Sequence, residues 1–401
     1  MAKPHLIVSL DVGTNSVKAL VVKRGSDSDL ETLAFLKKPI TGIRRGIVID
    51  VQSVAKAITE VREELEAQLG QGLDSVYVNV GGSHVFCVFC QGKVAVSRAD
   101  NKVSEEDIDR VLEDAKTFSL FPNKEILDIF PRHFIVDGEK VKEAIGMRGI
   151  RLEVEALMVY VFSPYYQNLN QSISNAGFRE IKDIIPSPLA AARSVLSPSQ
   201  KELGVALLDI GEGTSSLAVF EEGSLIHLAV LPIGSGNITH DIAIGLKTDI
   251  DIAENIKKEF GSCSLSKKEQ KEKIEIKEPE PLVFYRKYLA KIIEARISEI
   301  FEETNKELKK ISKDKLLPAG VVLTGGGSKT PGIIELAKKE LSLPCKIGKP
   351  KGFLNINKDP ALATVCGLAL IGLDSEAEED SLSIIEEIFS KIKSFFRFLI
   401  P

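Results

Sequence analysis

Two widely separated stretches of this 401-residue chain repeat one pattern, a buried strand, an Asp-x-Gly turn and a second strand. The first occupies residues 6–22, with its turn at Asp11-Val12-Gly13-Thr14, and the second occupies residues 205–220, with its turn at Asp209-Ile210-Gly211-Glu212. The period is too long for a solenoid of short repeats. The repetition therefore predicts two similar α/β halves, each of which presents a turn to a shared cleft.

Composition is that of a soluble globular protein, with 44% apolar and 27% charged residues, and the length favours two or more domains. A net charge of −5, 6% aromatic residues and no Trp argue against binding of nucleic acid. The five scattered cysteines indicate a reducing compartment. With no signal-peptide core and no long apolar run, we expect a cytoplasmic protein that does not span a membrane.

Changes in composition and in the pattern of expected helices and strands along the chain predict its domain boundaries. A lone helix among short strands between residues 81 and 162 indicates a small inserted α+β domain, and Ser104 and Asp107 resemble a capping box at the start of that helix. Residues 262–281 are rich in Lys and Glu and are expected to form a solvated loop. The expected units are a first half at 1–80, completed by 163–200 and about 355–373; the insertion at 81–162; a second half at 201–240 and 318–354; its own insertion at 241–317; a linker at 374–380; and a terminal helix at 381–401.

The two turns have the chemistry of a phosphate site. Glycine lets the backbone bend and approach an anion closely, and small hydroxyl side chains add donors. Asp11 and Asp209, each at the end of a strand, can hold Mg²⁺ through water, because magnesium keeps most of its hydration shell. A third glycine-rich strand end follows residues 321–323. The candidate ligands are Asp11, Gly13, Thr14, Asn15 and Ser16; Asp209, Gly211, Glu212, Gly213 and Thr214; and Gly325, Gly326, Gly327 and Ser328.

Other site motifs are missing from the sequence. It contains no P-loop, no G-x-G-x-x-G after a strand, no HExxH and no G-x-S-x-G. The five histidines are not paired at ligand spacing, so we expect them to be structural or at the surface. Cys87 and Cys90 form a single C-x-x-C in an apolar stretch, which favours inert buried thiols over a metal or redox site.

Taken together, these motifs resemble the actin-like ATPase superfamily and, within it, the FtsA family of bacterial cell-division proteins, over nearly the whole chain. Residues 11–14 with Lys18 resemble the first phosphate motif, residues 209–214 the second, and Gly325–Gly327 the adenosine motif. Residues 184–192 and 363–369 resemble the two hinge helices, and residues 253–257 resemble the segment that brings Glu254 and Lys257 to the nucleoside. The resemblance implies two ribonuclease-H-like halves around a cleft that binds ATP and Mg²⁺. The insertion at 81–162 also lies where this family carries its extra domain.

Three residues depart from the family pattern. Glu212 replaces a glycine of the second motif, and Ser216 stands where many relatives have Asp. Ser187 stands where related ATPases often present a Glu near the attacking water. Since hydrolysis needs a group that orients this water, we expect slow or negligible turnover and assign no catalytic residue.

The last residues predict an amphipathic helix that lies in a membrane surface. At about 100° per residue its large apolar side chains share one arc, and Lys and Arg follow on the other side. An alternative is a helix docked on the protein's own core or on a partner. The predicted membrane-facing residues are Ile385, Ile388, Phe389, Ile392, Phe395, Phe396 and Leu399.

The resemblance implies a cytoskeletal adaptor at the division site. Such a protein would bind ATP, self-associate into filaments on the cytoplasmic face of the inner membrane, and bind the C-terminal peptide of FtsZ through its second-half insertion, between Asp241 and Ile311. Two alternatives are a PilM-like scaffold of type IV pilus assembly and an ATP-driven kinase or chaperone of the same superfamily. The chain lacks a base for a sugar hydroxyl and a peptide-binding domain, which argues against the latter pair.

Overall fold

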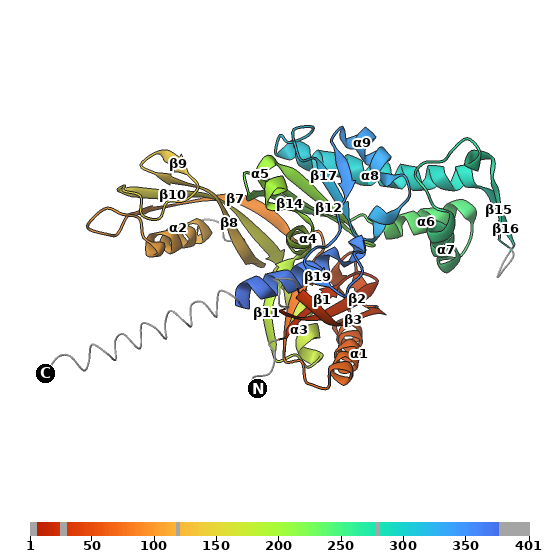
Figure 1. Ribbon diagram of the computed structural model, residues 1–401, viewed down its shortest axis with the longest axis horizontal. Helices are drawn as coiled ribbons and strands as arrows, with labels where there is room; N and C mark the ends of the chain where they lie inside the picture. Colours follow the sequence, from red (N-terminus) through yellow and green to blue (C-terminus); the bar gives the residue numbers. More distant parts are fainter. Residues whose placement is uncertain (1–5, 25–29, 118–120, 277–280, 377–401) are drawn as a thin grey trace.

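A computed structural model describes residues 6–24, 30–117, 121–276 and 281–376 of the chain. In Figure 1 two α/β bodies lie against each other in the middle of the molecule. The inserted unit with α2 projects from one end of the long axis, and the hairpin of β15 and β16 lies at the opposite end.

The first half is built on a sheet in the order β11-β6-β1-β2-β3-β19. Strands β1 to β3 form an antiparallel meander, and β6 and β11 extend it in parallel. Because side chains alternate along a strand, Val8 and Leu10 pack with α1 and α3 on one face, while Ile7 packs with the helix over residues 363–376 on the other. The elements are β1 (Ile7–Val12), β2 (Ser16–Arg24), β3 (Leu30–Pro39), β4 (Ile43–Arg44), β5 (Ile47–Val48), α1 (Val51–Leu69), β6 (Ser75–Val80), α3 (Ser163–Asn175), β11 (Glu180–Pro186), α4 (Ser187–Val195), α5 (Pro198–Leu203), β19 (Phe353–Leu354) and η3 (Pro360–Leu362).

The second half repeats this strand order. Its strands run β18-β17-β12-β13-β14, with an antiparallel meander from β12 to β14 and parallel pairing of β17 and β18. The repeated sequence pattern is therefore a structural duplication, and the predicted actin-like two-domain fold is confirmed. The elements are β12 (Val205–Ile210), β13 (Ser215–Glu221), β14 (Ser224–Leu231), α6 (Ser235–Leu246), α7 (Ile250–Phe260), α8 (Arg286–Lys310), β17 (Val321–Thr324), η2 (Gly326–Lys329), α9 (Ile333–Leu341) and β18 (Cys345–Ile347).

The inserted unit, one helix on an antiparallel sheet, adjoins the second half. Helix α2 lies on β7, where Gly92 leaves room for it, since a Cβ there would be 2.1 Å from the carbonyl oxygen of Val111. The expected cap is present, because the amides of Ser104 and Asp107 each donate to the other residue's side chain. A single ladder pair, Phe86 with Ala229, joins this sheet to β14. The elements are β7 (Phe86–Ala95), α2 (Glu105–Thr117), β8 (Lys124–Val136), β9 (Glu139–Val141) and β10 (Arg151–Phe162).

The cysteines of the C-x-x-C motif do not form a joint site. Cys87 bonds through its sulfur to the backbone of Leu228, at 3.2 Å, whereas the sulfur of Cys90 lies 3.4 Å from the carbonyl oxygen of Ala156. Burial raises the pKa of both thiols, that of Cys87 to about 11, which makes them poor nucleophiles. Within the described residues no group of three or more His, Cys, Asp or Glu side chains could hold a metal ion.

Residues 262–281 correct the expectation of a solvated loop. The described part of this stretch contains η1 (Glu269–Lys271) and β15 (Lys273–Ile276), which pairs with β16 (Leu282–Tyr285). Ile274 and Phe284 alternate inward and pack in the core of the second half. Lys273 and Glu275 occupy the outer positions of β15, so charged residues concealed its short alternating pattern.

The two predicted hinge helices cross between the halves. A Cβ at Gly367 would lie 1.6 Å from the carbonyl oxygen of Ala190, so the two backbones are in direct contact. Ser194 donates to the carbonyl oxygen of Ala363 at 2.7 Å, and Arg193 pairs with both oxygens of Asp374. Asp374 thus belongs to the helix over residues 363–376, although the sequence assigned it to a linker.

The predicted membrane-facing residues, from Ile385 to Leu399, lie outside the described residues. Across the ranges that the structure covers, none of the helices combines the length and the apolar character needed to cross a bilayer.

Candidate functional site

The two turns have the same backbone geometry. In the first, the amide of Gly13 donates to the carbonyl oxygen of Ser16 at 3.1 Å, and in the second the amide of Gly211 donates to that of Thr214 at 2.9 Å. In both, the Asp stands one position before the last paired residue of its strand. Each Asp-x-Gly turn therefore brings one carboxylate and a glycine-rich backbone to the same edge of its sheet.

These turns meet face to face across the two halves. A Cβ at Gly213 would be 2.5 Å from the hydroxyl oxygen of Thr14 and 3.1 Å from the Cα atom of Arg45. The hydroxyl of Thr14 is held in turn by the amide of Gly46, which donates to it at 3.1 Å. The contact requires a glycine at position 213 and brings the candidate residues of both turns into one place.

Acidic residues of the two strands lie at the centre of this site. Lys18, opposite Asp11 in the β1–β2 ladder, donates to the Asp11 carboxylate at 2.6 Å. Burial opposes the charge of Lys18, but Asp11 outweighs that effect and the pKa of Lys18 is raised. Asp209 accepts a hydrogen bond from Thr364 at 3.1 Å. Burial, and then the charge of Asp11, raise the pKa of Asp209 to about 6.

The third glycine-rich segment closes against Asp209. Gly325 has a φ of +82°, and a Cβ there would lie 2.1 Å from a carboxylate oxygen of Asp209. Gly327 packs on Ile210 in the same way, whereas a Cβ at Gly326 would meet nothing within 4 Å. The hydroxyl of Ser328 donates back to the carbonyl oxygen of Gly325 at 2.8 Å, which holds the turn together.

Glu254 and Lys257 reach the site through α6. The start of α6 rests on the second turn, where the amides of Ser235 and Gly236 donate at 2.8 Å to the carbonyl oxygens of Gly211 and Glu212. Lys257 donates to the carbonyl oxygen of Ser235 and to the hydroxyl of Thr239, and it pairs with Glu254 at 2.6 Å. In this structure the two charged side chains contact each other and α6.

Asn15 and Ser16 contribute backbone rather than side-chain contacts in the first turn. The carbonyl oxygen of Asn15 accepts from the amide of Ile40 at 3.1 Å, and that of Ser16 accepts from Gly13. The candidates from positions 11 to 18, 209 to 214, 254 to 257 and 325 to 328 are thus brought together, some by direct contact and others through α6.

Sequence reasoning missed Asn79 and Thr364 and did not predict the hydrogen bonds of Ser187. The side-chain oxygen of Asn79 accepts from the amide of Val12 at 2.7 Å, and its amide group donates to Ser187 at 3.0 Å. The hydroxyl of Ser187 donates to the carbonyl oxygen of Val80, so it is engaged with the backbone of the site. A lone Asn in the apolar strand at 75–80 was the available signal for this network.

The buried Asp209 carboxylate predicts a pH-dependent loss of stability. Between the ordinary Asp pKa of 3.8 and about 6, the folded chain keeps a proton that the unfolded chain has released, so stability falls as the pH rises through this window. At pH 7.5 the loss is on the order of 3 kcal/mol. We expect Asp209→Asn, without nucleotide or divalent cation, to melt at a higher temperature than wild type at pH 7.5, with a smaller gap at pH 4.5.

The control for this melt is Asp109→Asn, which removes an exposed carboxylate from α2 and should leave the melting temperature unchanged at both pH values. If Asp209→Asn melts at or below the wild-type temperature at pH 7.5, the ionised Asp209 carboxylate does not destabilise the fold.

Comparison with known proteins extends over almost the whole chain. A family model described as "Cell division protein FtsA" matches residues 206–367, and one described as "SHS2 domain inserted in FTSA" matches residues 82–160. The chain is 34% identical over 393 residues to the cell division protein FtsA of Pseudomonas aeruginosa, covering 96% of this chain and 93% of that one. Identity to the FtsA of Bacillus subtilis is 35% over 372 residues, covering 92% and 83%.

Solved structures share the fold at much lower identity. The PilM-PilN type IV pilus biogenesis complex matches with a TM-score of 0.65 and 18% identity, covering 91% of this chain and 98% of that one. MreB5 of Spiroplasma citri bound to ADP matches with a TM-score of 0.58 and 13% identity, covering 94% and 98%. These two structures show only an actin-like fold. The long matches at 34% and 35% identity, together with the match of the inserted domain, show that the chain belongs to the FtsA family of cell division proteins.

Proposed function

We propose that this actin-like division protein binds Mg-ATP between its two halves, associates with copies of itself on the cytoplasmic face of the inner membrane, and tethers FtsZ there at the division site. The observation that carries the proposal is the meeting of the two Asp-x-Gly turns at Thr14 and Gly213. Family membership supports the role in division, and the fold shared with an ADP-bound MreB5 supports the choice of ligand.

The residues at the strand ends suit a magnesium-bound nucleotide. Asp11 and Asp209 are two carboxylates on facing strand ends, and their mutual repulsion is relieved by a divalent cation. They would hold Mg²⁺ through water, and the cation would neutralise phosphate charge. Lys18 and the amides of the two glycine turns would bind the phosphates, and Gly325–Ser328 would lie at the adenosine.

Asp209 offers a direct test of nucleotide binding. Asp209→Asn keeps the shape and the acceptor for Thr364 but removes the charge, so we expect Mg-ATP affinity to fall at least about tenfold, roughly 1.4 kcal/mol. Titration calorimetry on the folded variant measures this, with Asp109→Asn as the control. Unchanged affinity for Mg-ATP would show that the nucleotide does not use this carboxylate.

Hydrolysis is proposed to be slow. The hydroxyl of Ser187 is engaged with Asn79 and Val80, and it lacks the reach and basicity of a carboxylate that could orient water. We expect a rate of phosphate release below about 1 per second, under the usual enzyme range. A steady-state assay of the purified chain, without membrane or FtsZ, measures it, and a rate within that range contradicts this interpretation.

Membrane attachment is assigned to the terminal segment on its sequence alone. Its apolar arc and basic flank are the pattern of an interfacial helix. One short helix without a lipid chain binds weakly, so self-association would strengthen attachment by presenting several helices at once.

Phe396→Glu tests this attachment. Phe396 lies within the apolar arc, where a charge must enter the apolar boundary or lift the helix, and burying such a side chain is worth roughly 1.5–3 kcal/mol. We expect the variant to lose liposome binding, as should a chain that ends at Asp380, and to retain Mg-ATP binding. Lys393→Glu faces the headgroups and should weaken binding only on anionic lipid.

A thermal melt without lipid separates this role from the alternative. A terminal helix docked on the protein's own core would make Phe396→Glu lower the melting temperature of the whole chain. That result, combined with liposome binding that survives truncation at Asp380, would refute membrane attachment.

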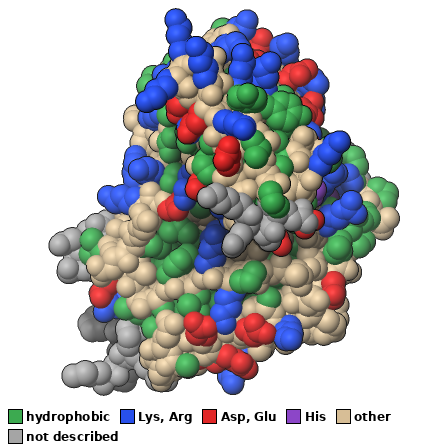
Figure 2. Space-filling view, turned by 90° about the vertical axis from the view of Figure 1, so that its right-hand side faces the viewer, with side chains coloured by type: hydrophobic (Ala, Val, Ile, Leu, Met, Phe, Trp, Pro, Cys, Tyr) green, Lys and Arg blue, Asp and Glu red, His purple; other side chains and the backbone are tan. Residues whose placement is uncertain are grey.

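The FtsZ peptide is assigned to a groove on the second-half insertion. The groove is about 390 Å³ in volume, and Tyr285 and Tyr288 expose 60% and 47% of their surface there. Figure 2 looks onto this end of the molecule and shows Lys and Arg side chains gathered among hydrophobic ones. Exposed rings beside lysines suit a peptide with both apolar and acidic side chains. The groove is lined by Gln270, Lys271, Tyr285, Lys287, Tyr288 and Lys291.

Two substitutions in this groove test the partner. Tyr288→Ala removes a central ring and Lys291→Glu reverses a charge, so we expect each to weaken binding of the FtsZ C-terminal peptide at least about tenfold. Lys306→Ala, on the same helix but outside the groove, is the matched control and should bind as wild type. Equal affinity in all three variants, measured by calorimetry, would exclude this groove.

A further inference from the structure

A short segment connects the glycine-rich turn at Gly325 with the groove on the second-half insertion. We name residues 262–272 the strap; they follow α7 and lead into β15. One end of the strap bonds to the residues after η2, and the other contributes Gln270 and Lys271 to the groove. The strap therefore touches both sites that the proposed function requires.

The first end is tied to the glycine-rich turn through Pro331. The amide of Cys263 donates to the carbonyl oxygen of Pro331 at 2.8 Å. The hydroxyl of Ser262 donates to the carbonyl oxygen of Ser264 and lies 3.3 Å from the Pro331 oxygen. Both strap residues are buried. Next to Pro331, the amide and hydroxyl of Thr330 donate to the carbonyl oxygen of Gly327, at 3.2 and 2.9 Å. Hydrogen bonds therefore connect the turn at Gly327 to Cys263 through Thr330 and Pro331.

Close packing reinforces this connection. Gly332 has a φ of +79°, and a Cβ there would lie 2.8 Å from the Cβ of Ser264. The amide of Gly261 donates to the carbonyl oxygen of Lys257, the residue on α7 whose side chain reaches the start of α6. The strap therefore packs against the residues after η2 and follows α7, which carries Lys257.

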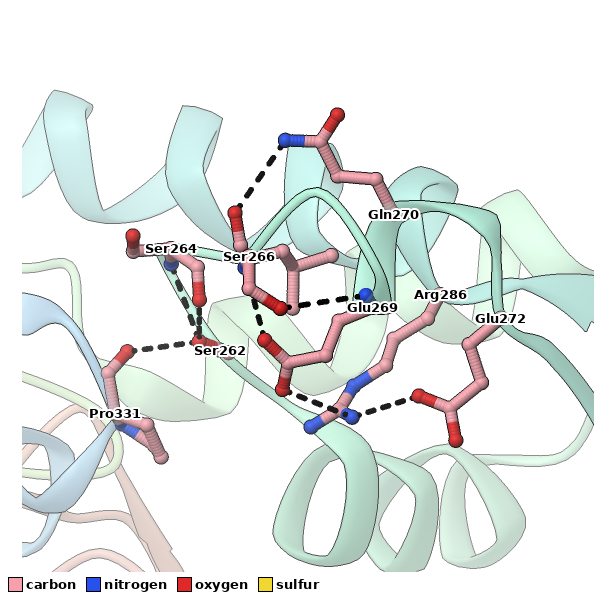
Figure 3. A network of polar contacts seen from close by, with 9 residues as sticks. Ser262, Ser264, Ser266, Glu269, Gln270, Glu272, Arg286 and Pro331 are labelled. Carbon is pink, nitrogen blue, oxygen red and sulfur yellow. Dashed lines mark hydrogen bonds and ion pairs between the residues drawn. The ribbon is translucent and has the colours of Figure 1, made fainter.

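The second end is held by Arg286, the first residue of α8. Ser266 and Glu269 cap each other, as the amide of Ser266 donates to the Glu269 carboxylate at 2.8 Å. One nitrogen of Arg286, Nη1, pairs with Glu269 at 3.2 Å and with Glu272 at 2.8 Å. Figure 3 shows Arg286 pointing between these two carboxylates, and we name the three residues the latch. The latch fixes the strap wall of the groove against the α8 wall.

The latch contains a buried group without a partner. Nε of Arg286 is inaccessible to solvent and makes no hydrogen bond with any of the described residues, while both acidic partners share Nη1. An arginine pairs best when two of its nitrogens meet the two oxygens of one carboxylate. A shift of the strap that turned Glu269 or Glu272 toward Nε would give this nitrogen a hydrogen-bond acceptor. A second arrangement of the latch would therefore gain a hydrogen bond that the present one lacks.

We propose that the strap and the latch couple nucleotide binding to partner binding. This inference rests on the proposed function at both sites. A nucleotide held at Gly325–Ser328 fixes Pro331 and the strap, the latch moves with them, and the groove binds the FtsZ peptide more tightly. Coupling is reciprocal, so the peptide tightens nucleotide binding by the same factor.

Hydrogen exchange on the full chain, with and without saturating Mg-AMPPNP, tests the coupling without any partner. In wild type we expect nucleotide to slow exchange at least about threefold both in the strap and over residues 285–292. In Arg286→Ala the strap should still respond, but residues 285–292 should not. Lys306→Ala is the matched control and should behave as wild type. Like Arg286, Lys306 is a cation on α8 that pairs with two glutamates, but both of its partners lie on α8 itself.

Affinity for the FtsZ C-terminal peptide is the second measurement. We expect Mg-AMPPNP to tighten peptide binding at least about fivefold in wild type and in Lys306→Ala, and to leave it unchanged in Arg286→Ala. Glu269→Gln, a milder change at a half-buried side chain, should also reduce the ratio of the peptide affinities with and without Mg-AMPPNP, so a folding defect of Arg286→Ala would not decide the outcome.

The outcomes separate the coupling from the proposed function. The coupling is refuted, and the proposed function stands, if nucleotide and peptide both bind but Mg-AMPPNP leaves the peptide affinity of wild type unchanged. The same holds if Mg-AMPPNP tightens peptide binding in Arg286→Ala as much as in wild type. If the peptide does not bind while nucleotide alters exchange over residues 285–292, the link from the nucleotide site to the groove stands, and the FtsZ role and its coupling to nucleotide are refuted. If Mg-AMPPNP does not bind, both are refuted.

Discussion

Two helices that cross at Gly367 link the halves of this chain. There the backbone of the helix over residues 363–376 lies against the carbonyl oxygen of Ala190 on α4, at a distance that excludes any side chain. The chain passes from the first half to the second through α4 and α5 and returns between β18 and β19, before the 363–376 helix begins. Thr364 of that helix donates to Asp209 at the end of β12, so the helix that packs on α4 also contacts the strand end of the second half.

The site formed by the two Asp-x-Gly turns lowers the stability of the protein when no ligand is bound. Asp209 is buried beside another carboxylate, and Lys18 and Thr364 offset part of its charge. Such an arrangement disfavours the ionised form. Relief of this repulsion would favour the magnesium-bound nucleotide proposed for the site, which is a common exchange of stability for function.

The two insertions extend this core in opposite directions, and they are attached differently. The inserted unit at one end joins β14 through a single ladder pair, next to the Cys87 sulfur that bonds to the Leu228 backbone. The hairpin at the other end is attached through the strap and Arg286 to the residues that follow η2. A groove joined to the candidate nucleotide site by a few hydrogen bonds is well placed to respond to it, whereas the contacts of the inserted unit lead from Cys87 through His227 on β14 to Glu307 on α8.

Local pattern in the sequence predicted much of this structure. The Ser104 and Asp107 pair marked a helix cap, and the repeated Asp-x-Gly turns marked the duplication. These features depend on residues a few positions apart. Over that distance the backbone geometry of a helix, strand or turn determines how residues are spaced, so the sequence alone reveals them. The resemblance to a known family supplied the roles of Lys18, Glu254 and Lys257.

Contacts between distant segments were decided only by the tertiary structure. The hairpin of β15 and β16 is hidden by its charged outer face, and the pairing of Asn79 with Ser187 joins residues from different elements. Neither the strap nor the latch has a motif, because each is made of ordinary Ser, Glu and Arg residues that matter only through what they meet. The sequence by itself determined the two halves and their turns, since these follow from short-range periodicity. The closeness of the turns, the burial of Asp209 and the route from Pro331 to Arg286 arise from packing, which no local pattern records.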